Sequence, residues 1–177
     1  MKLPMFTALG LGIWESAVIT TDTMETRKHY RLAREAADAR CKPLLVVGGP
    51  GASPIVRLVK IPRHGCGDVC LDVNLTSCSI CGAAVEQVEA DVRCIPYPNK
   101  HFGAAFASHV LEHLPTPADA LDAFNELKRV ADEVHVVSPT KLSLVAWLHP
   151  GHRLWVRQVE GSLEATLLRS EGERLFV

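Results

Sequence analysis

The residues of this chain that could do chemistry gather in two short stretches. One is residues 101–114 (HFGAAFASHVLEHL), where polar side chains follow an apolar run, and the other is residues 147–153 (WLHPGHR). Histidine exchanges protons near neutral pH, and arginine suits carboxylates and phosphates. The candidate active-site residues are Ser108, His109 and His113 in the first stretch and His149, His152 and Arg153 in the second.

Among these residues, His109 is the candidate catalytic group because it lies with Ser108 at the junction where the apolar run ends. Its imidazole can line a ligand pocket or act as a general base toward a hydroxyl or amine. His113, one helical turn later, suits a structural hydrogen bond or a substrate contact, whereas Glu112 is expected to be a charge at the start of a helix. The second stretch either contacts the substrate or forms a turn with solvated histidines.

Apolar runs predict the strands that position these residues. Gly103–Ala107 predicts a buried strand that gives way at Ser108 to a helical segment. Leu44–Val47 predicts another buried strand, which ends in the glycine-rich turn Gly48-Gly49-Pro50-Gly51. Such a turn lets the backbone approach a ligand closely. Because ligands of open α/β sheets bind at the carboxyl ends of strands, both strand ends are candidate ligand sites.

Acidic residues follow two further predicted strands. Asp72 lies at the end of the strand predicted for residues 68–74, about 20 residues beyond the glycine turn. A carboxylate at this place can bind both ribose hydroxyls of a nucleotide, or it can cap a turn. Asp91 and Val92 follow a short third strand, residues 85–90, in a loop that contains two prolines.

The remaining patterns complete an α/β fold. Thr116, Pro117 and Asp119 predict the N-cap, first and third positions of a helix, and residues 133–139 predict a fifth strand. The alternation of strands and helices predicts a doubly wound, mostly parallel sheet. Residues 154–168 predict an antiparallel hairpin, which we expect to complete the edge of that sheet.

The N-terminal residues are apolar, but Glu15 near their middle would cost about 2.5 to 3.5 kcal/mol at the centre of a bilayer. We expect residues 1–20 to pack over the domain; contact with a membrane surface or a protein, or a signal or anchor, are the alternatives. Residues 21–40 predict a surface helix. This N-terminal part, residues 1–40, precedes a single domain, residues 41–177, in a protein expected to be cytoplasmic or membrane-associated.

Four cysteines form a Cys-x3-Cys-x7-Cys-x2-Cys array, with His64 nearby. Four thiolates could hold a tetrahedral zinc ion, and a disulfide such as Cys78 to Cys81 is a second alternative. Cys70 shares a strand face with Asp72, however, and should point into the packing of the sheet. We therefore expect buried or loose thiols and no bound metal.

Overall charge and composition limit the class of protein. The formal net charge is −1, which argues against a nucleic-acid surface built on bulk charge. With 177 residues, of which 47% are hydrophobic, the chain can bury the core of one globular domain. No nucleic-acid partner is expected.

From about Leu44 to Pro139 the chain resembles a small class I S-adenosylmethionine-dependent methyltransferase of the type 11 kind. The most specific part of the resemblance is the order Asp91, Ile95-Pro96-Tyr97-Pro98, Phe102 and then Ser108 to His113. The resemblance implies an enzyme with S-adenosylmethionine as cofactor and a small-molecule or lipid-like acceptor. A non-catalytic binding or scaffold subunit that uses the apolar N-terminus is the alternative function, and oligomers are compatible with both.

Residue roles follow from the same resemblance. The glycine turn would hold the methionine part of the cofactor, Asp72 the ribose, and Asp91 with Val92 the adenine, while Ser108 and His109 would form the wall beside the transferable methyl group. The cofactor residues implied are Gly48, Gly49, Gly51, Asp72, Asp91, Val92, Ser108 and His109. Two departures stand out: Val46 or Val47 replaces an acid of the first strand, and Gly103 replaces a common aspartate.

Overall fold

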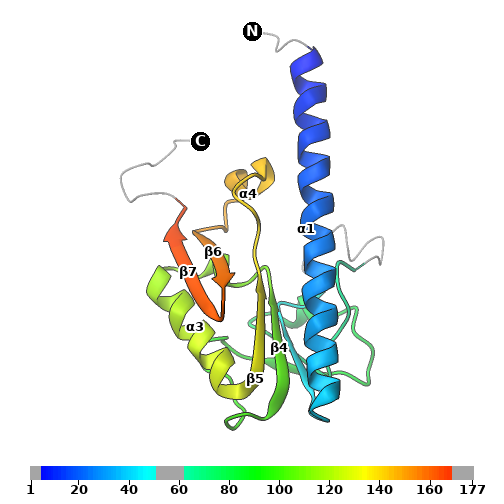
Figure 1. The fold of residues 1–177 in the computed structure, drawn as a ribbon, viewed down its shortest axis with the longest axis vertical. Helices are drawn as coiled ribbons and strands as arrows, with labels where there is room; N and C mark the ends of the chain where they lie inside the picture. The colour runs from blue at the N-terminus through cyan, green and yellow to red at the C-terminus, as the bar shows by residue number, and fades with distance from the viewer. Residues whose placement is uncertain (1–4, 51–61, 169–177) are drawn as a thin grey trace.

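A computed structural model of the chain describes residues 5–50 and 62–168. Within these residues the chain forms a five-stranded parallel sheet of order β3-β2-β1-β4-β5, as Figure 1 shows. The elements are α1 (Met5–Ala39), β1 (Leu44–Val47), β2 (Val69–Asp72), η1 (Leu75–Cys78), β3 (Glu86–Glu89), β4 (Phe102–Ser108), η2 (Leu111–His113), α3 (Pro117–Val130), β5 (Ala131–Val137), α4 (Leu144–Leu148), β6 (Leu154–Val159) and β7 (Ser162–Leu167). The predicted α/β class and parallel sheet are confirmed. Gly51 lies outside the described residues. So do residues 55–61, for which the sequence predicts a short helix or a crossover.

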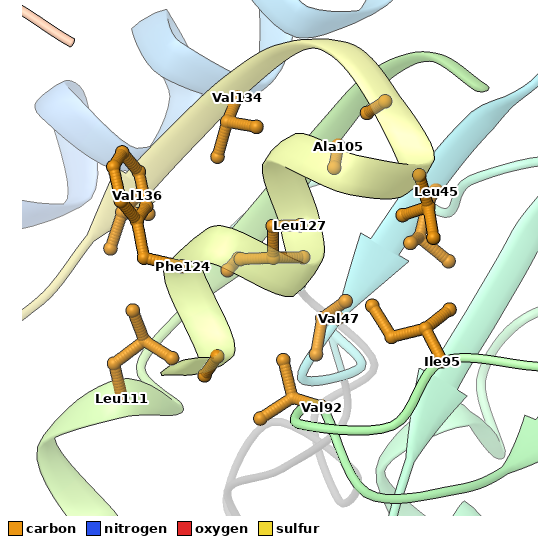
Figure 2. Close-up of a cluster of buried hydrophobic side chains, with 14 of the residues drawn as sticks. Leu45, Val47, Val92, Ile95, Ala105, Leu111, Phe124, Leu127, Val134 and Val136 are labelled. Carbon is orange, nitrogen blue, oxygen red and sulfur yellow. The ribbon is translucent and has the colours of Figure 1, made fainter. Parts of the chain in front are cut away.

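The sheet is covered on both faces, because successive strand residues point to opposite sides. Leu44 and Val46 of β1 pack with Ala33 and Ala37 of α1 in one buried cluster. The intervening Leu45 and Val47 join the larger cluster beneath α3. Figure 2 shows Phe124 and Leu127 of α3 over side chains from β1, β4 and β5. This two-sided burial explains why β1 is apolar at every position.

Helix α1 is longer than the sequence predicts. It is expected only from residue 21, yet it runs unbroken from Met5 through 35 residues, roughly 52 Å at 1.5 Å per residue. Its C-terminal half lies on the sheet, while its N-terminal half projects beyond the rest of the domain (Figure 1). Exposed Leu9 and Ile13 show that this part of α1 does not pack over the domain. The expectation holds from Trp14 and Glu15, which bond to residues 142–145, to buried Val18.

Gly103, where the resembled family commonly has an aspartate, has a packing role. A Cβ atom at this position would lie 2.8 Å from Ala37 Cα and 3.1 Å from Ala37 O of α1. Any larger side chain would therefore push α1 away from β4. The missing aspartate reflects the close approach of α1 to the sheet.

Helix α3 begins as the sequence predicts. Thr116 Oγ1 accepts a hydrogen bond from Asp119 N at 3.2 Å, and Thr116 N donates to Asp119 Oδ2 at 3.1 Å, with Pro117 at the first helical position. Such a cap is typically worth about 1 kcal/mol. The cap fixes where the chain turns back toward β5.

The C-terminal hairpin forms as predicted, but its expected place at the sheet edge is wrong. In the described part of the chain, β6 and β7 pair only with each other, as a separate two-stranded sheet. The side chain of Gln158 covers the edge strand β5: its Oε1 accepts from Val136 N at 2.7 Å, and its Nε2 donates to Val134 O at 2.8 Å. Since the carboxamide satisfies these edge groups, no main-chain ladder is needed there.

The four cysteines of the array are paired, so the expectation of free thiols is wrong. Disulfides join Cys66 to Cys81 and Cys70 to Cys78, and neither is the Cys78 to Cys81 pair considered from the sequence. Cys70, Cys78 and Cys81 form a small buried cluster. The disulfides fasten η1 and the turn before β3 to β2, where doubly wound folds usually place a helix.

None of the described helices is both long enough and apolar enough to cross a membrane.

Candidate functional site

The candidate site lies where the direction of the sheet reverses. Strands β1 and β4 are neighbours, but the chain leaves β1 toward β2 on one side and leaves β4 toward β5 on the other. Open α/β sheets bind ligands in the crevice at such a switch point, outside the carboxyl ends of the strands. Gly48-Gly49 and Ser108-His109 occupy these two ends, so the fold brings together the two strand ends that the sequence predicts as ligand sites.

Glycine is required at both positions of the turn after β1. Gly48 has φ +77°, and a Cβ there would clash with Val110 and lie 2.6 Å from Ser108 O. A Cβ on Gly49 would clash with Ser77 O and lie 2.7 Å from Cys78 N. The turn is thus held between β4 and η1, with its backbone close to the crevice.

Asp72 ends β2 beside this turn and is half-buried. Its Oδ1 accepts from Asn74 N at 3.1 Å, and its Oδ2 accepts from Ser77 Oγ at 2.6 Å. These bonds show the turn-capping role and fix the orientation of the carboxylate, whereas ribose binding stays a prediction. Each oxygen retains a further lone pair for a ligand hydroxyl.

Asp91 and Val92 are engaged by the protein itself. The guanidinium of Arg93 binds the Asp91 carboxylate, with Nη2 2.7 Å from Oδ2, and it also reaches Asp119. The hydrogen bonds from Arg93 hold the pKa of Asp91 below its usual value. Val92 is buried in the main hydrophobic core with Val47. Neither residue lines the cavity that opens at the switch point.

A cavity of about 490 Å³ opens at the switch point. It unites three predicted cofactor residues, Gly49, Ser108 and His109, with three predicted substrate residues, His113, His149 and His152. Arg153 does not line it: this side chain is exposed, while its backbone N–H donates to Glu112 O at 2.8 Å. Other lining residues include Val18, Ile19, Asp22, Pro50, Arg63, His64, Pro139, Thr140, Ser143, Val145 and Ala146.

His109 is held between two carboxylates. Its backbone is left-handed, with φ +54°, and its N–H donates to Val137 O at 2.9 Å. Its Nδ1 lies 3.3 Å from Glu112 Oε1, and its Nε2 lies 3.4 Å from Asp22 Oδ2 of α1. Arg63 Nη1 lies 3.3 Å from the same Nε2 and 3.6 Å from Asp22 Oδ2.

Those carboxylates decide the charge of His109. Burial alone would lower its pKa, but the contacts with Asp22 and Glu112 outweigh burial and raise the pKa to about 9. The imidazole is therefore protonated at neutral pH, and a protonated imidazole cannot accept another proton. This environment argues against the general-base role considered for His109.

Glu112 is the partner that the sequence misjudged. A solvated helix-start charge is expected, but η2 is a single three-residue turn and Glu112 is only 1% exposed. Burial would raise its pKa, yet the adjacent His109 lowers it. Glu112 Oε2 also accepts from Ser138 Oγ at 3.1 Å. Glu112 is thus a buried anion that fixes His109.

The other three histidines meet at the mouth of the cavity. The ring centroids of His113 and His152 are 4.8 Å apart, and the rings of His149 and His152 stack at 4.2 Å. The hydrogen bond expected of His113 is present, between its Nδ1 and Gly151 O at 2.9 Å. Desolvation and the neighbouring histidines lower the pKa of both His149 and His152, against the raising effect of Glu112.

Helix α1 contributes a part of the site that the sequence did not indicate. Glu15 accepts hydrogen bonds at the N-terminus of α4, from Ser143 Oγ at 2.6 Å and from the N–H groups of Leu144 and Val145 at 2.8 and 3.1 Å. One to two turns later, Val18 and Ile19 line the cavity and Asp22 reaches His109. Nothing in the local sequence links α1 to residues about 90 to 130 positions away, so this half of the site is found only in the fold.

Comparison with known proteins gives a family match. Residues 48–133 match the family model described as "Methyltransferase domain". No curated protein matches the sequence.

Solved structures of methyltransferases are also similar to the chain. One is CalS10 with S-adenosylmethionine bound, an amino pentose methyltransferase from Micromonospora echinaspora: identity is 18%, coverage 74% of this chain and 53% of that chain, and TM-score 0.38. Another is a Burkholderia thailandensis 1,6-didemethyltoxoflavin-N1-methyltransferase, with 14% identity, 74% and 62% coverage, and a TM-score of 0.36. The chain spans between 41% and 62% of the length of the similar structures.

Proposed function

We propose that the chain, whose residues 48–133 match the family model of a methyltransferase domain, transfers a methyl group from S-adenosylmethionine to an apolar small-molecule or lipid-like acceptor. The observation that carries this proposal is the cavity at the switch point. One side of this cavity consists of strand-end residues that suit the cofactor, and the other side consists of apolar residues from α1 and α4.

The strand-end residues fit the cofactor. Gly48 and Gly49 leave no space for a side chain, so a ligand at this turn meets bare backbone. Asp72 is oriented by Asn74 and Ser77 and keeps lone pairs for ribose hydroxyls. Within this proposal Gly51 also belongs to the cofactor residues, Asp91 stands at the adenine end, and Val92 supports that end from the core.

Cationic groups beside the turn suit the carboxylate of the methionine part. His109 is protonated at neutral pH, since its pKa is about 9, and the guanidinium of Arg63 lies 3.3 Å away. Asp22 holds both groups. In this proposal His109, whose two ring nitrogens face Glu112 and Asp22, lines the cofactor pocket beside Ser108 and does not remove a proton.

The chemistry asks little more of the side chains. S-adenosylmethionine supplies a methyl group on a positively charged sulfur, which is a good leaving group. The protein contributes by holding the acceptor in line with that methyl group and by excluding water, and effects of this kind account for large rate gains.

The acceptor side supports an apolar substrate. Val18, Ile19, Val145 and Ala146 line it, and Leu142, Leu144, Val145 and Leu148, which lie in α4 or just before it, are exposed. Apolar surface gathered at a cavity entrance is typical of a binding site. His113, His149 and His152 provide the polar contacts at this end.

Calorimetric titration tests the cofactor half of this proposal. We expect S-adenosylmethionine and its demethylated product to bind the wild-type chain. Asp72→Asn should lower the affinity for both ligands by roughly tenfold or more, because charge-assisted hydrogen bonds are lost. Asp38→Asn, on the exposed C-terminal turns of α1, is the matched control and should bind like wild type. Absence of binding at millimolar ligand would remove the enzymatic function.

The projecting half of α1 favours a second candidate function, a non-catalytic subunit that docks a partner there. Leu9, Ile13 and Trp14 are 63%, 64% and 49% exposed. Deletion of residues 1–12 separates the two functions. A docking subunit would lose its partner and keep cofactor binding, whereas for the proposed enzyme the deletion leaves both cofactor affinity and turnover of a soluble acceptor near wild type.

A further inference from the structure

Three imidazoles converge at the mouth of the cavity from two segments of the chain. His113 comes from η2, His149 follows α4, and His152 lies in the loop before β6. One ring nitrogen from each lies within 4.8 Å of the others. In a tetrahedral site with metal–nitrogen distances of about 2.0 to 2.1 Å, ligand nitrogens are on the order of 3.3 Å apart. Modest side-chain rotation would therefore complete a three-histidine site.

Hydrogen bonds already fix the tautomer of two of these rings. His113 Nδ1 lies 2.9 Å from Gly151 O, and His152 Nδ1 lies 3.1 Å from Ala146 O. Carbonyl oxygens only accept, so each Nδ1 carries a proton and each Nε2 keeps a free lone pair. Metal-binding histidines are typically oriented in this way by a backbone carbonyl on the other nitrogen.

His149 is the ring that has to adjust. Its Nδ1 accepts from Gly151 N at 3.2 Å, so this lone pair is weakly engaged in the absence of a metal. Releasing this long hydrogen bond frees the nitrogen. The cost is small because the Gly151 N–H lies at the surface, where water can replace the histidine.

The backbone around the three rings is built to bring them together. Arg153 N–H donates to Glu112 O at 2.8 Å and thereby ties the loop to η2. A Cβ on Gly151 would lie 3.1 Å from His113 Nδ1 and 3.2 Å from His149 Cε1. A residue with a Cβ atom here would press on both rings. The convergence of the histidines thus follows from close packing, and not from chance contact of long surface side chains.

We propose that His113, His149 and His152 bind one divalent first-row transition metal ion, with zinc as the best fit. Imidazole nitrogens suit zinc, copper, iron and nickel, whereas magnesium and calcium prefer oxygen ligands. Three protein ligands with an open fourth position are the composition of catalytic zinc sites, in contrast to the closed four-ligand structural sites. The open position would face the cavity that the three residues line.

Binding of the metal stands independently of methyl transfer, but its use rests on the proposed function. An ion at the acceptor side would coordinate an oxygen, nitrogen or sulfur of the acceptor and weaken its bond to hydrogen. This predicts acceptors that combine an apolar body with one such heteroatom. It differs from the sequence expectation that the chain binds no metal.

The test uses the full chain, stripped of metal and kept without reductant so that the disulfides stay closed. Zn²⁺ titrated by calorimetry should bind at one ion per chain, and Co²⁺ should show the visible d–d absorption of a low-coordinate site without the near-ultraviolet thiolate charge-transfer band. His149→Ala and His152→Ala should each weaken Zn²⁺ binding by on the order of 100-fold or more. This loss exceeds the one expected when a residue that only hydrogen-bonds a metal ligand is removed. His101→Ala, an exposed histidine elsewhere, is the matched control and should bind like wild type.

Two results would overturn the proposal. One is the absence of stoichiometric Zn²⁺ and Co²⁺ binding to a chain whose circular dichroism shows it to be folded. The other is binding that persists in His149→Ala and His152→Ala, or that carries a thiolate band, because the metal would then sit on cysteines. S-adenosylmethionine titration of the same metal-free samples keeps the outcomes separate: cofactor binding without metal binding refutes only the metal site, and the reverse refutes only the methyltransferase function.

Discussion

The two sides of the crevice are built in different ways. On the cofactor side, glycines follow β1, an aspartate ends β2 and a serine ends β4. The backbone does most of the positioning there. On the acceptor side, α1, α4 and the loop that carries His149 and His152 meet through contacts such as Glu15 with Ser143 and His113 with Gly151. The first side is fixed by strand order and the second by side chains far apart in sequence. Substitutions should therefore damage the cofactor side through folding and the acceptor side through local geometry.

The largest effect is expected from Gly48→Ala on the cofactor side. The alanine would combine a left-handed φ of +77° with clashes against Val110 and Ser108, so the free energy of unfolding should fall by more than about 3 kcal/mol. Gly161→Ala separates the two causes, because Gly161 has φ +80° and nothing within 4 Å of its Cβ position. It should cost only about 1 to 2 kcal/mol. Urea denaturation measures both, and equal losses would show that the close approach of Gly48 has no importance.

A second large effect is expected from the disulfide beside Asp72. Joint substitution of Cys70→Ser and Cys78→Ser opens an eight-residue loop and should cost about 2.5 kcal/mol on the loop-entropy relation. It should also weaken the binding of S-adenosylmethionine, because Cys78 anchors Ser77, which holds the Asp72 carboxylate. Exposed Cys41 and Cys94 are free, so Cys41→Ser with Cys94→Ser is the control. A thiol count of six in the denatured, unreduced wild type would contradict the pairing itself.

The difference between local patterns and long-range contacts explains which features the sequence could predict. The strands, the cap at Thr116 and the glycine turn are local patterns, and each lies within a few residues of its predicted place. The pairing of Cys66 with Cys81 could not be predicted, because four cysteines allow three pairings and spacing does not choose among them.

Long-range contacts account for the errors as well. The edge of the sheet was assigned wrongly because one side chain, Gln158, replaces a strand ladder. Glu112 resembles an ordinary helix-start charge until the fold buries it beside His109. The local sequence of Asp22 gives no sign of its contact with His109. Its role depends on where a helix of 35 residues crosses the sheet, which Gly103 sets by allowing close contact.

On the acceptor side, Glu15→Ala should have a smaller and more local effect. It removes the carboxylate that caps α4, at a cost of about 1 kcal/mol typical of an N-cap. Amide hydrogen exchange of residues 144–148 should accelerate, and acceptor turnover should fall while S-adenosylmethionine affinity stays unchanged. Glu25→Ala, farther along α1 with only weak ion pairs to Lys28 and His29, is the matched control. A loss of cofactor affinity in Glu15→Ala would show that the two sides are not separate.

The last effect is expected at His109, where the two sides meet, and it is a dependence on pH. The pKa of His109 rises from about 6.5 in the unfolded chain to about 9 in the fold, because Asp22 and Glu112 outweigh burial. A raised pKa means that the folded state binds the proton more tightly. The stabilisation is therefore fully present below about pH 6.5 and is lost as the pH rises through about 9.

His109→Asn should remove this dependence, and asparagine tolerates the left-handed backbone at φ +54°. The difference in free energy of unfolding between wild type and variant should thus shrink as the pH rises from 6.5 to 9, as followed by urea denaturation at each pH. Arg63 faces the same Nε2 and opposes its protonation, so Arg63→Gln should enlarge the difference at low pH. A difference that grows with pH would mean that His109 is neutral in the fold, and a neutral His109 would restore the general-base role that its two carboxylate neighbours argue against.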